Sequence, residues 1–379
     1  MKPFTSKYLI SLSMIMFLLG GCQVSDSPTE LDVDSKGEES TETLAKPRSQ
    51  TTESIIELVD QSLEREISEE DDSLALANAF LGTLTEQERE DILYQFTAEN
   101  AARWSNLPAS YENRNGLALG DLSDESVIAA LALVKSSLSE EGFQTLAEIM
   151  KADAFLKNTY KEPEWGANLY FIALVGTPSK TDPWMIQFSG HHLAENIVVN
   201  AKEESATPQF TGIEPQPFGW DEKTVVPLEP KQTAMYAMLS SFSEDQLKAA
   251  KLSGSFEDVA VGPGKDGEFP ASEGIRYTDL AIHQQAYVKE AMKAWVTGAS
   301  NETAGALLDA YFTEEALADT YIGWAGSRNF KDPGSYIRID GPRVWIEIST
   351  KEGVADPENL HFHTVWRDKL ADYGGAFTD

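Results

Sequence analysis

The sequence predicts an α+β fold, with a helical N-terminal half and interleaved helices packed on an antiparallel sheet. Apolar residues recur at helical spacing from Ser54 to about Lys157, and alternating runs typical of strands begin near Ala167. Helical runs and strand runs are segregated along the chain, which favours an antiparallel sheet over alternating βαβ units.

The N-terminus is predicted to be a lipoprotein signal peptide, residues 1–21. Lys2 and Lys7 flank the start of an apolar run over 8–19, which is shorter than the roughly 20 residues of a transmembrane helix. Leu19-Gly20-Gly21-Cys22 follows and resembles a bacterial lipobox. We therefore expect cleavage after residue 21 and lipidation of Cys22. An ordinary signal peptide that happens to contain a cysteine is the alternative.

A lipidated Cys22 would anchor the mature chain to a membrane of the bacterial cell envelope. Gln23 at the next position, rather than Asp, favours the outer membrane. Residues 22–52 are rich in Ser, Thr, Asp and Glu, and they are predicted to form a disordered acidic tether before a single body at 53–379. Because Cys22 is the only cysteine, an intrachain disulfide and a cysteine-ligated metal site are excluded.

The chain is strongly acidic, with a formal net charge of -32 at pH 7. No basic patch interrupts this charge, so we do not expect nucleic acid as a partner. The acidic residues are spread along the chain, which is typical of a heavily solvated surface; capture of divalent cations is the alternative. The expected partners are the membrane, through Cys22, and a small-molecule ligand that the sequence does not identify.

Helix starts are marked by capping residues in the N-terminal half. Thr85-Glu-Gln-Glu88 fits a capping box, and Ser123 and Ser139 are placed to cap two further helices. A helix, a short break and a capped helix are predicted near 80–88 and again near 238–246, an echo too short to establish a repeat. Further helices are expected at about 231–252 and 278–319.

The predicted strands fall into two groups. The first group precedes a loop rich in Pro and Gly at 207–230 and comprises 168–175, 184–189 and 197–199. The second group is an antiparallel meander with turns between its members, at 320–324, 335–339, 344–348 and 360–365.

Four of the five histidines lie in two clusters, His191-His192 and His361-Phe362-His363. Neutral imidazole is a common ligand of transition metals. Alternate residues of a strand face the same side, so the rings of His361 and His363 should share one face. We therefore predict that the two clusters, His191, His192, His361 and His363, supply the ligands of a site for one transition metal ion, either Zn, Cu or Fe. Structural histidines that are hydrogen-bonded in a polar core are the alternative.

Adjacent residues on a regular strand face opposite sides, so only one histidine of the first cluster is expected to join the site. His191 is favoured because it continues the face of Gln187 and Ser189. Gly190 before it predicts a bulge or a close backbone approach. His283 stands alone in a predicted helix and is expected to be structural.

Glu347 and Arg367 are the candidate catalytic residues. Glu347 belongs to the strand before His361 and His363, and antiparallel pairing could place its carboxylate near the histidine face as a ligand, an orienting partner or a general base. Arg367 shares the face of the two histidines. Plain core ion pairs between Glu347 and arginines are the alternative, and for each arginine taken singly they are favoured.

Motifs in both halves of the chain resemble one known family. The first half carries Phe188-Ser-Gly-His-His-Leu193 and Thr207-Pro-Gln-Phe210, and the second carries Tyr336-Ile-Arg-Ile-Asp-Gly-Pro342 and His361-Phe-His-Thr-Val-Trp-Arg-Asp368. Together they resemble the bacterial and fungal family known as domain of unknown function 3500, over about residues 70–375. That family has no established activity, so the resemblance groups these residues without implying a reaction.

The chain departs from the family pattern at two places. Glu195 stands where family members have an apolar residue. The chain ends at Asp379 without the further histidine that often follows the Asp-Tyr-Gly motif of the family, here Asp372-Tyr-Gly374. The resemblance therefore implies no additional ligand from the C-terminal tail.

Two functions from different classes are compatible with these residues. The first is a metal-dependent hydrolase or oxidase of the cell envelope, in which an open coordination position activates water or binds oxygen. The second is a non-catalytic surface lipoprotein that binds a ligand or a metal. An open position lined by Trp and Arg would favour the enzyme, whereas a closed shell of four ligands without a pocket would favour the binding protein.

Overall fold

One long sheet runs through the part of the chain that the computed structural model describes, which is residues 50–67, 72–109, 111–161, 163–203, 205–329 and 332–377. These residues belong to the unit Lys46–Asp379, and the other unit of the chain, Met1–Ala45, lies outside them, as do the predicted signal peptide, Cys22 and the tether up to residue 49. Within the described ranges, no helix has the length and apolar character needed to cross a membrane.

The sheet has eleven strands and consists of two meanders that meet at its centre. Its order is β1-β3-β4-β5-β6-β13-β12-β11-β10-β9, with β2 beside β3, and only the pairing of β1 with β3 is parallel. The strands are β1 Leu93–Tyr94, β2 Leu117–Ala118, β3 Phe171–Val175, β4 Trp184–Gly190, β5 Leu193–Val199, β6 Gln209–Gln216, β9 Ile275–Arg276, β10 Tyr321–Gly326, β11 Ser335–Asp340, β12 Val344–Glu352 and β13 Leu360–Asp368. A separate hairpin comprises β7 Phe218–Trp220 and β8 Lys223–Val225.

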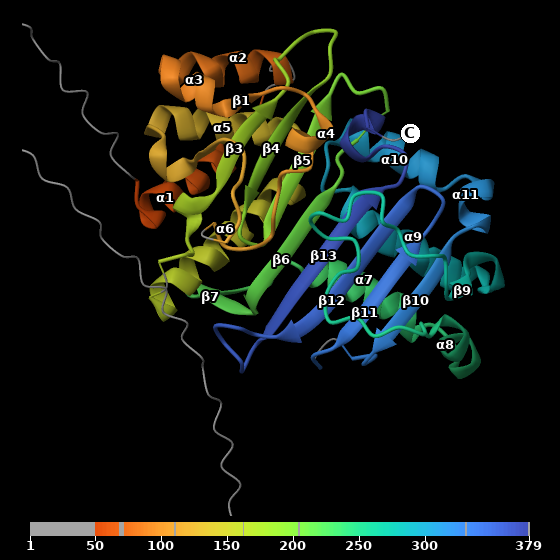
Figure 1. Ribbon diagram of the computed structural model, residues 1–379. Helices are drawn as coiled ribbons and strands as arrows, with labels where there is room; N and C mark the ends of the chain where they lie inside the picture. The colour runs from red at the N-terminus through yellow and green to blue at the C-terminus, as the bar shows by residue number, and fades with distance from the viewer. Residues whose placement is uncertain are drawn as a thin grey trace, which may run out of the picture. The chain divides into compact units, whose positions relative to one another are not determined.

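Helices cover one face of this sheet. In Figure 1, α6 lies behind the first meander and α7 and α9 lie behind the second, whereas irregular segments cross the face toward the viewer. The α-helices are α1 Thr52–Glu64, α2 Ser73–Thr83, α3 Glu86–Ile92, α4 Ala98–Ala101, α5 Asp124–Ser136, α6 Glu140–Tyr160, α7 Glu229–Ser240, α8 Glu244–Ala250, α9 Ile282–Val296, α10 Asn301–Tyr311 and α11 Glu314–Ala318. Four short 3-10 helices are η1 Leu119–Asp121, η2 Ala167–Leu169, η3 Tyr277–Asp279 and η4 Asp372–Gly375. The predicted α+β class is confirmed.

The predicted caps are present. The Thr85 side chain accepts a hydrogen bond from the backbone N–H of Glu88, and the Glu88 side chain accepts one from the backbone N–H of Thr85. Ser123 and Ser139 cap α5 and α6 in the same way, by accepting from backbone N–H groups of the first turn. These caps satisfy donors that a helix start leaves without partners.

The similarity between the two halves of the chain includes more elements than the two helices noted in the sequence. In each half, a capping box is followed by a short strand (β2 or β9), a 3-10 helix (η1 or η3), further helices and a four-stranded meander. Gly116 and Gly274, which both have a positive φ, precede the two short strands. A Cβ would lie 1.9 Å from a strand carbonyl oxygen at Gly116 and 2.2 Å from one at Gly274. Only glycine fits at both places. The two halves therefore share this close approach, and they share the order of the elements named above, although β1, α4 and η2 of the first half and α11 of the second have no counterpart.

Two of the boundaries that differ from the expectation affect the centre of the sheet and the start of the body. The segment 207–230 was expected to be a loop, but it contains the central strand β6. Its Pro215 lies where the pairing with β13 shifts register between Leu360 and Phe362, so the missing N–H falls at a bulge. In addition, α1 begins at Thr52 and Gln50 hydrogen-bonds to Gly120, so the body begins at least three residues before the expected boundary.

The buried apolar residues of the described ranges form three clusters. The largest packs the helices against the sheet. The second lies on the other face and is formed by Ala101, Trp104, Val175, Met185, Ala194, Val198, Phe210, Val365 and Tyr373. The third comprises Leu252, Ala325 and Tyr336. The second cluster fixes irregular segments to the face on which the histidines lie.

Candidate metal centre

His361 and His363 share one face of β13, as their spacing predicts. Both are buried, and their Nε2 atoms lie 2.8 Å apart. Gly212 on β6 pairs with His363, and a Cβ there would come within 3.0 Å of the ring carbons of both His363 and His192. A glycine at this position therefore leaves the space in which the imidazole rings converge.

The turn between β4 and β5 supplies the third ring. Gly190 pairs with Leu193, so His191 and His192 form a two-residue turn. His192 has a φ of 64°, and its Nε2 lies 2.8 Å from Nε2 of His361. A Cβ at Gly190 would lie 2.6 Å from the Tyr170 ring. The close approach expected at Gly190 is thus an approach to an aromatic ring at the end of β4.

The structure reverses the expected preference within this cluster, because His192 rather than His191 meets His361 and His363. Nδ1 of His191 lies 2.8 Å from Oδ1 of Asp153 on α6, and the His191 ring stacks on His192 with 3.6 Å between centroids. The prediction assumed a regular strand through both residues. In a turn with one left-handed residue, successive side chains do not alternate between the two faces of a sheet. The prediction from strand faces therefore did not apply.

Carboxylates lie against the outer nitrogens of the second cluster. Oδ1 of Asp258 is 2.8 Å from Nδ1 of His363. Oε2 of Glu214 is 3.3 Å from Nδ1 of His361, an ion-pair distance without the alignment of a hydrogen bond. The other oxygen of Glu214 accepts backbone N–H groups from Ala355 and Asp356. Such carboxylates orient an imidazole and place its proton on Nδ1.

This arrangement directs ring nitrogens of the three histidines toward one another. Burial, followed by the neighbouring histidines, holds the pKa of His192 and His361 well below the usual value, and burial also lowers the pKa of His363. The rings are therefore neutral, and each carries its one proton on either Nδ1 or Nε2. The 2.8 Å contacts of His361 Nε2 with Nε2 of His192 and of His363 are hydrogen bonds where one of the two nitrogens carries that proton, and a metal ion can take the place of the proton.

Among the residues that the structure describes, two groups of buried side chains could hold a metal ion. One is His192, His361 and His363, and the other is Asp153, His191 and His192; within each, the ligand atoms lie within 4.8 Å of one another. The first group presents three nitrogens of one kind, which suits Zn, Cu or Fe. His283 lies apart from both groups, exposed on α9.

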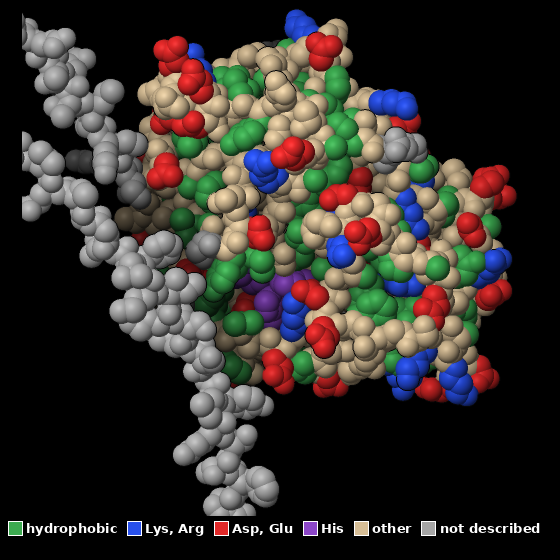
Figure 2. All heavy atoms as spheres, viewed as in Figure 1, with side chains coloured by type: hydrophobic (Ala, Val, Ile, Leu, Met, Phe, Trp, Pro, Cys, Tyr) green, Lys and Arg blue, Asp and Glu red, His purple; other side chains and the backbone are tan. Residues whose placement is uncertain are grey.

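A cavity of about 740 Å³ opens beside the three rings. Its lining includes all four clustered histidines together with Arg103, Trp104, Tyr111, Trp165 and Lys351. Figure 2 shows the histidines in a hollow of the surface, with hydrophobic side chains next to them. A ligand entering this cavity can reach the point on which the nitrogens converge.

Glu347 shares the histidine face of the sheet, but its carboxylate holds an irregular segment. Its oxygens accept backbone N–H groups from Ala260 and Val261 at 2.7 and 2.8 Å, and the Tyr336 hydroxyl at 2.7 Å. Burial raises the pKa of Glu347. The segment that it fixes carries Asp258, so Glu347 acts on the site through that neighbour.

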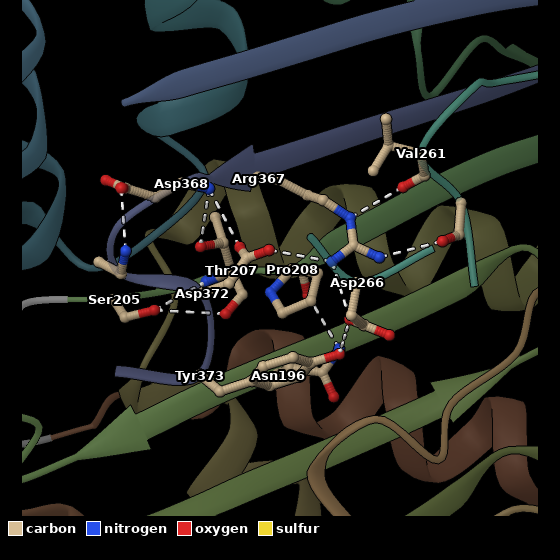
Figure 3. Close-up of polar contacts among 12 residues, drawn as sticks. Asn196, Ser205, Thr207, Pro208, Val261, Asp266, Arg367, Asp368, Asp372 and Tyr373 are labelled. Atoms are coloured by element: carbon tan, nitrogen blue, oxygen red, sulfur yellow. Dashed lines mark hydrogen bonds and ion pairs between the residues drawn. The ribbon is translucent and has the colours of Figure 1, made fainter. Parts of the chain in front are cut away.

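Arg367 holds the same segment from β13, and Figure 3 shows its guanidinium directed at Val261 and Asp266. It donates to the carbonyl oxygens of Val261 and Gly262 at 2.8 and 3.0 Å, and to the carboxylates of Asp266 and Asp372 at 2.9 Å each. Pro263 and Gly264 of this segment line the cavity. Arg367 therefore positions one wall of the cavity.

Trp104 forms part of another wall and is tied to the same network. Its Nε1–H donates to the Tyr373 hydroxyl at 2.9 Å, which in turn donates to Asp266 at 2.6 Å. The Arg367 guanidinium lies 5.5 Å from the centre of the Trp104 ring. Contacts of this kind restrain an aromatic ring and its orientation.

Sequence reasoning missed the residues around the histidines, namely Asp153, Glu214, Asp258 and Lys351. The carboxylates come from α6, from β6 and from an irregular segment, and they have no shared spacing. Lys351 did carry a signal, because it continues the alternation of Glu347 and Ser349 on β12. The strand was predicted to end at residue 348, so this signal was not used.

The comparisons with known proteins agree with the motifs. The family described as "Protein of unknown function (DUF3500)" matches residues 67–375, which is most of the chain. No curated protein and no solved structure matches.

Proposed function

The chain belongs to this family of unknown function, and we propose that it is a metal-dependent enzyme of the bacterial cell envelope. His192, His361 and His363 would hold one transition metal ion, and the adjacent cavity would admit the substrate. Lipidated Cys22 would anchor the chain to a membrane, and Gln23 favours the outer membrane.

The observation that supports this proposal is the convergence of three buried imidazole rings through their ring nitrogens. Tetrahedral Zn–N bonds of about 2.0–2.1 Å place ligand nitrogens roughly 3.3 Å apart. The separations of 2.8 Å from His361 to His192 and to His363 are slightly shorter. An ion would move these rings apart by a few tenths of an ångström and would replace the contacts between nitrogens by three bonds to the metal.

The cavity is the reason for proposing catalysis rather than storage of a metal. Three protein ligands leave a coordination position for water or substrate, as in catalytic zinc sites. A bound metal lowers the pKa of its water to about 7 and thereby supplies a nucleophile for hydrolysis, whereas Cu or Fe would supply oxidative chemistry. The identity of the metal would therefore decide between a hydrolase and an oxidase.

Elemental analysis of the chain lacking residues 1–22, purified without a histidine tag, tests the proposal. We expect about one ion of Zn, Cu or Fe per chain. Protein that stays metal-free after incubation with each of these ions would contradict the proposed site. A bound ion that cannot exchange its fourth ligand would instead support the non-catalytic alternative.

A further inference from the structure

We infer that Lys351 binds an anionic oxygen of the substrate next to the metal, and that the substrate is a small amphiphilic anion, a carboxylate or phosphate joined to an apolar body. This inference rests on the proposed metal site. It assigns a role to a lysine and to a set of apolar side chains that the metal site does not use.

Lys351 lies beside the histidines through strand pairing. It is the partner of His361 in the β12–β13 register, and its ammonium pairs with Oδ2 of Asp258, whose Oδ1 contacts His363. Its positive charge therefore lies beside His361 and next to the carboxylate that contacts His363.

The ammonium group can also reach a ligand in the cavity. Lys351 lines the cavity, and 27% of its side chain is exposed. An ammonium has three N–H donors, and the contact with Asp258 uses one of them. A divalent ion and Lys351 would carry three positive charges, which the carboxylates of Asp258, Glu214 and Asp153 balance. Glu214 and Asp153 contact Nδ1 atoms of the rings, on the side away from Nε2, so an anionic oxygen in the cavity could be bound by both the metal and Lys351.

Three exposed apolar side chains line the cavity, beside polar ones such as Arg103 and Glu112. Leu107, Tyr111 and Val354 are 44%, 66% and 77% exposed, and all three line this cavity. They are three of the seven exposed large hydrophobic residues in the described part of the chain. Exposed apolar side chains gathered at one cavity mark a ligand site. The part of the substrate that extends away from the metal is therefore apolar.

Anion titrations of the Co²⁺-loaded chain lacking residues 1–22 test this inference through the visible spectrum of the ion. The probes are acetate and phenylacetate, then phosphate and phenyl phosphate, so that each pair differs by an aromatic ring. We expect the aromatic member to bind at least tenfold more tightly, and the tighter pair identifies the head group. Equal affinity within both pairs would overturn the apolar body.

Substitutions of Lys351 separate its charge from its contact with Asp258. K351M and K351Q should weaken anion binding at least tenfold, whereas K351R, which keeps the charge, should stay within about threefold of the wild type. K248M is the matched control, because Lys248 also pairs with an aspartate, Asp245, but on the exposed helix α8. Unchanged anion affinity in K351M would overturn the role of Lys351.

Two further outcomes distinguish this inference from the proposed function. Wild-type protein that binds no Co²⁺ would overturn the metal site itself. Loss of Co²⁺ from K351M and K351Q, but not from K351R, would assign Lys351 to metal retention through Asp258 and would overturn its role in substrate binding.

Discussion

The carboxylate of Asp258 accepts a hydrogen bond from Nδ1 of His363, with 2.8 Å between the two atoms. Asp258 lies on the irregular segment that Glu347 and Arg367 hold against the sheet. The two side chains expected to be catalytic thus act on the orientation of one proposed ligand. A substitution of Glu347 or Arg367 would therefore affect metal binding by displacing Asp258.

Replacing Asp258 by Asn should weaken the metal site without abolishing it. The amide keeps the size of the side chain but removes the charge that favours a proton on Nδ1 of His363. Loss of such an outer partner typically costs about 10–100-fold in metal affinity. Competition with a chelator measures this affinity, and D245N at the exposed Lys248 pair is the control. An unchanged affinity in D258N would contradict the orienting role.

Alanine substitutions of single histidines should distinguish the histidines that bind the metal from those that do not. H363A and H192A each remove one of three ligands, so both should lose the ion during gel filtration. H283A should retain it because His283 is exposed on α9. H191A should retain most of it, since His191 pairs with Asp153 instead. Elemental analysis gives the result, and full metal content in H363A would rule out the three-histidine site.

Much of the fold could be predicted because its signals are local. Helical periodicity and the capping residues Thr85, Ser123 and Ser139 depend only on nearby residues, and the structure has each of them in its predicted role. The central strand β6 was missed because proline normally ends a strand. Pro215 is accommodated by a bulge opposite β13, a feature that depends on a partner about 150 residues away.

The candidate site was predictable only where strand alternation applies. His361 and His363 share a face because they lie two residues apart on one strand. His192 was not preferred because its direction depends on a left-handed residue in a turn. Asp258 and Glu214 meet the histidines only through tertiary structure, and no sequence spacing between separate elements indicates such a contact.

The stability of the chain should depend on the ionisation of Glu195, a fully buried residue of β5. Burial raises its pKa to about 7 from an ordinary value of 4.5. Between these two pH values the folded chain keeps a proton that the unfolded chain releases, so the free energy of unfolding falls as pH rises from 4.5 to 7. E195Q cannot ionise and should lack this part of the decline.

Urea unfolding at several pH values between 4.5 and 7 measures the difference between the wild type and E195Q. We expect the wild type to lose stability relative to the variant by on the order of 2 kcal/mol across this range. E57Q, on an exposed position of α1, should follow the wild type. Parallel curves for the wild type and E195Q would show that Glu195 ionises normally in the folded chain.

Membrane attachment should depend on Cys22. C22S removes the thiol that would be lipidated, and the described residues contain no helix able to cross a membrane. We therefore expect C22S to appear in the soluble fraction, whereas the wild type requires detergent. Membrane fractionation with detection of the body measures this. Tight membrane association of C22S would contradict lipid anchoring.

The boundary between tether and body should be visible in two deletions. Removing residues 23–49 should leave the melting temperature unchanged, because that composition offers little apolar surface for a core. Removing residues 23–52 should lower it, because Gln50 donates to Leu122, Thr51 caps α1, and buried Thr52 donates to Asn168. A lost cap and two lost hydrogen bonds amount to about 2–3 kcal/mol, or several degrees.

Calorimetry of the two deletions, each made in a chain that starts after residue 22, distinguishes the two boundaries. T51A is the matched control for the cap, since it keeps the chain length and removes only the side chain that accepts from Ser54. Its melting temperature should fall between those of the two deletions. An equal melting temperature for both deletions would place the boundary at 53, whereas a drop on removing 23–49 alone would mean that the acidic segment packs on the body.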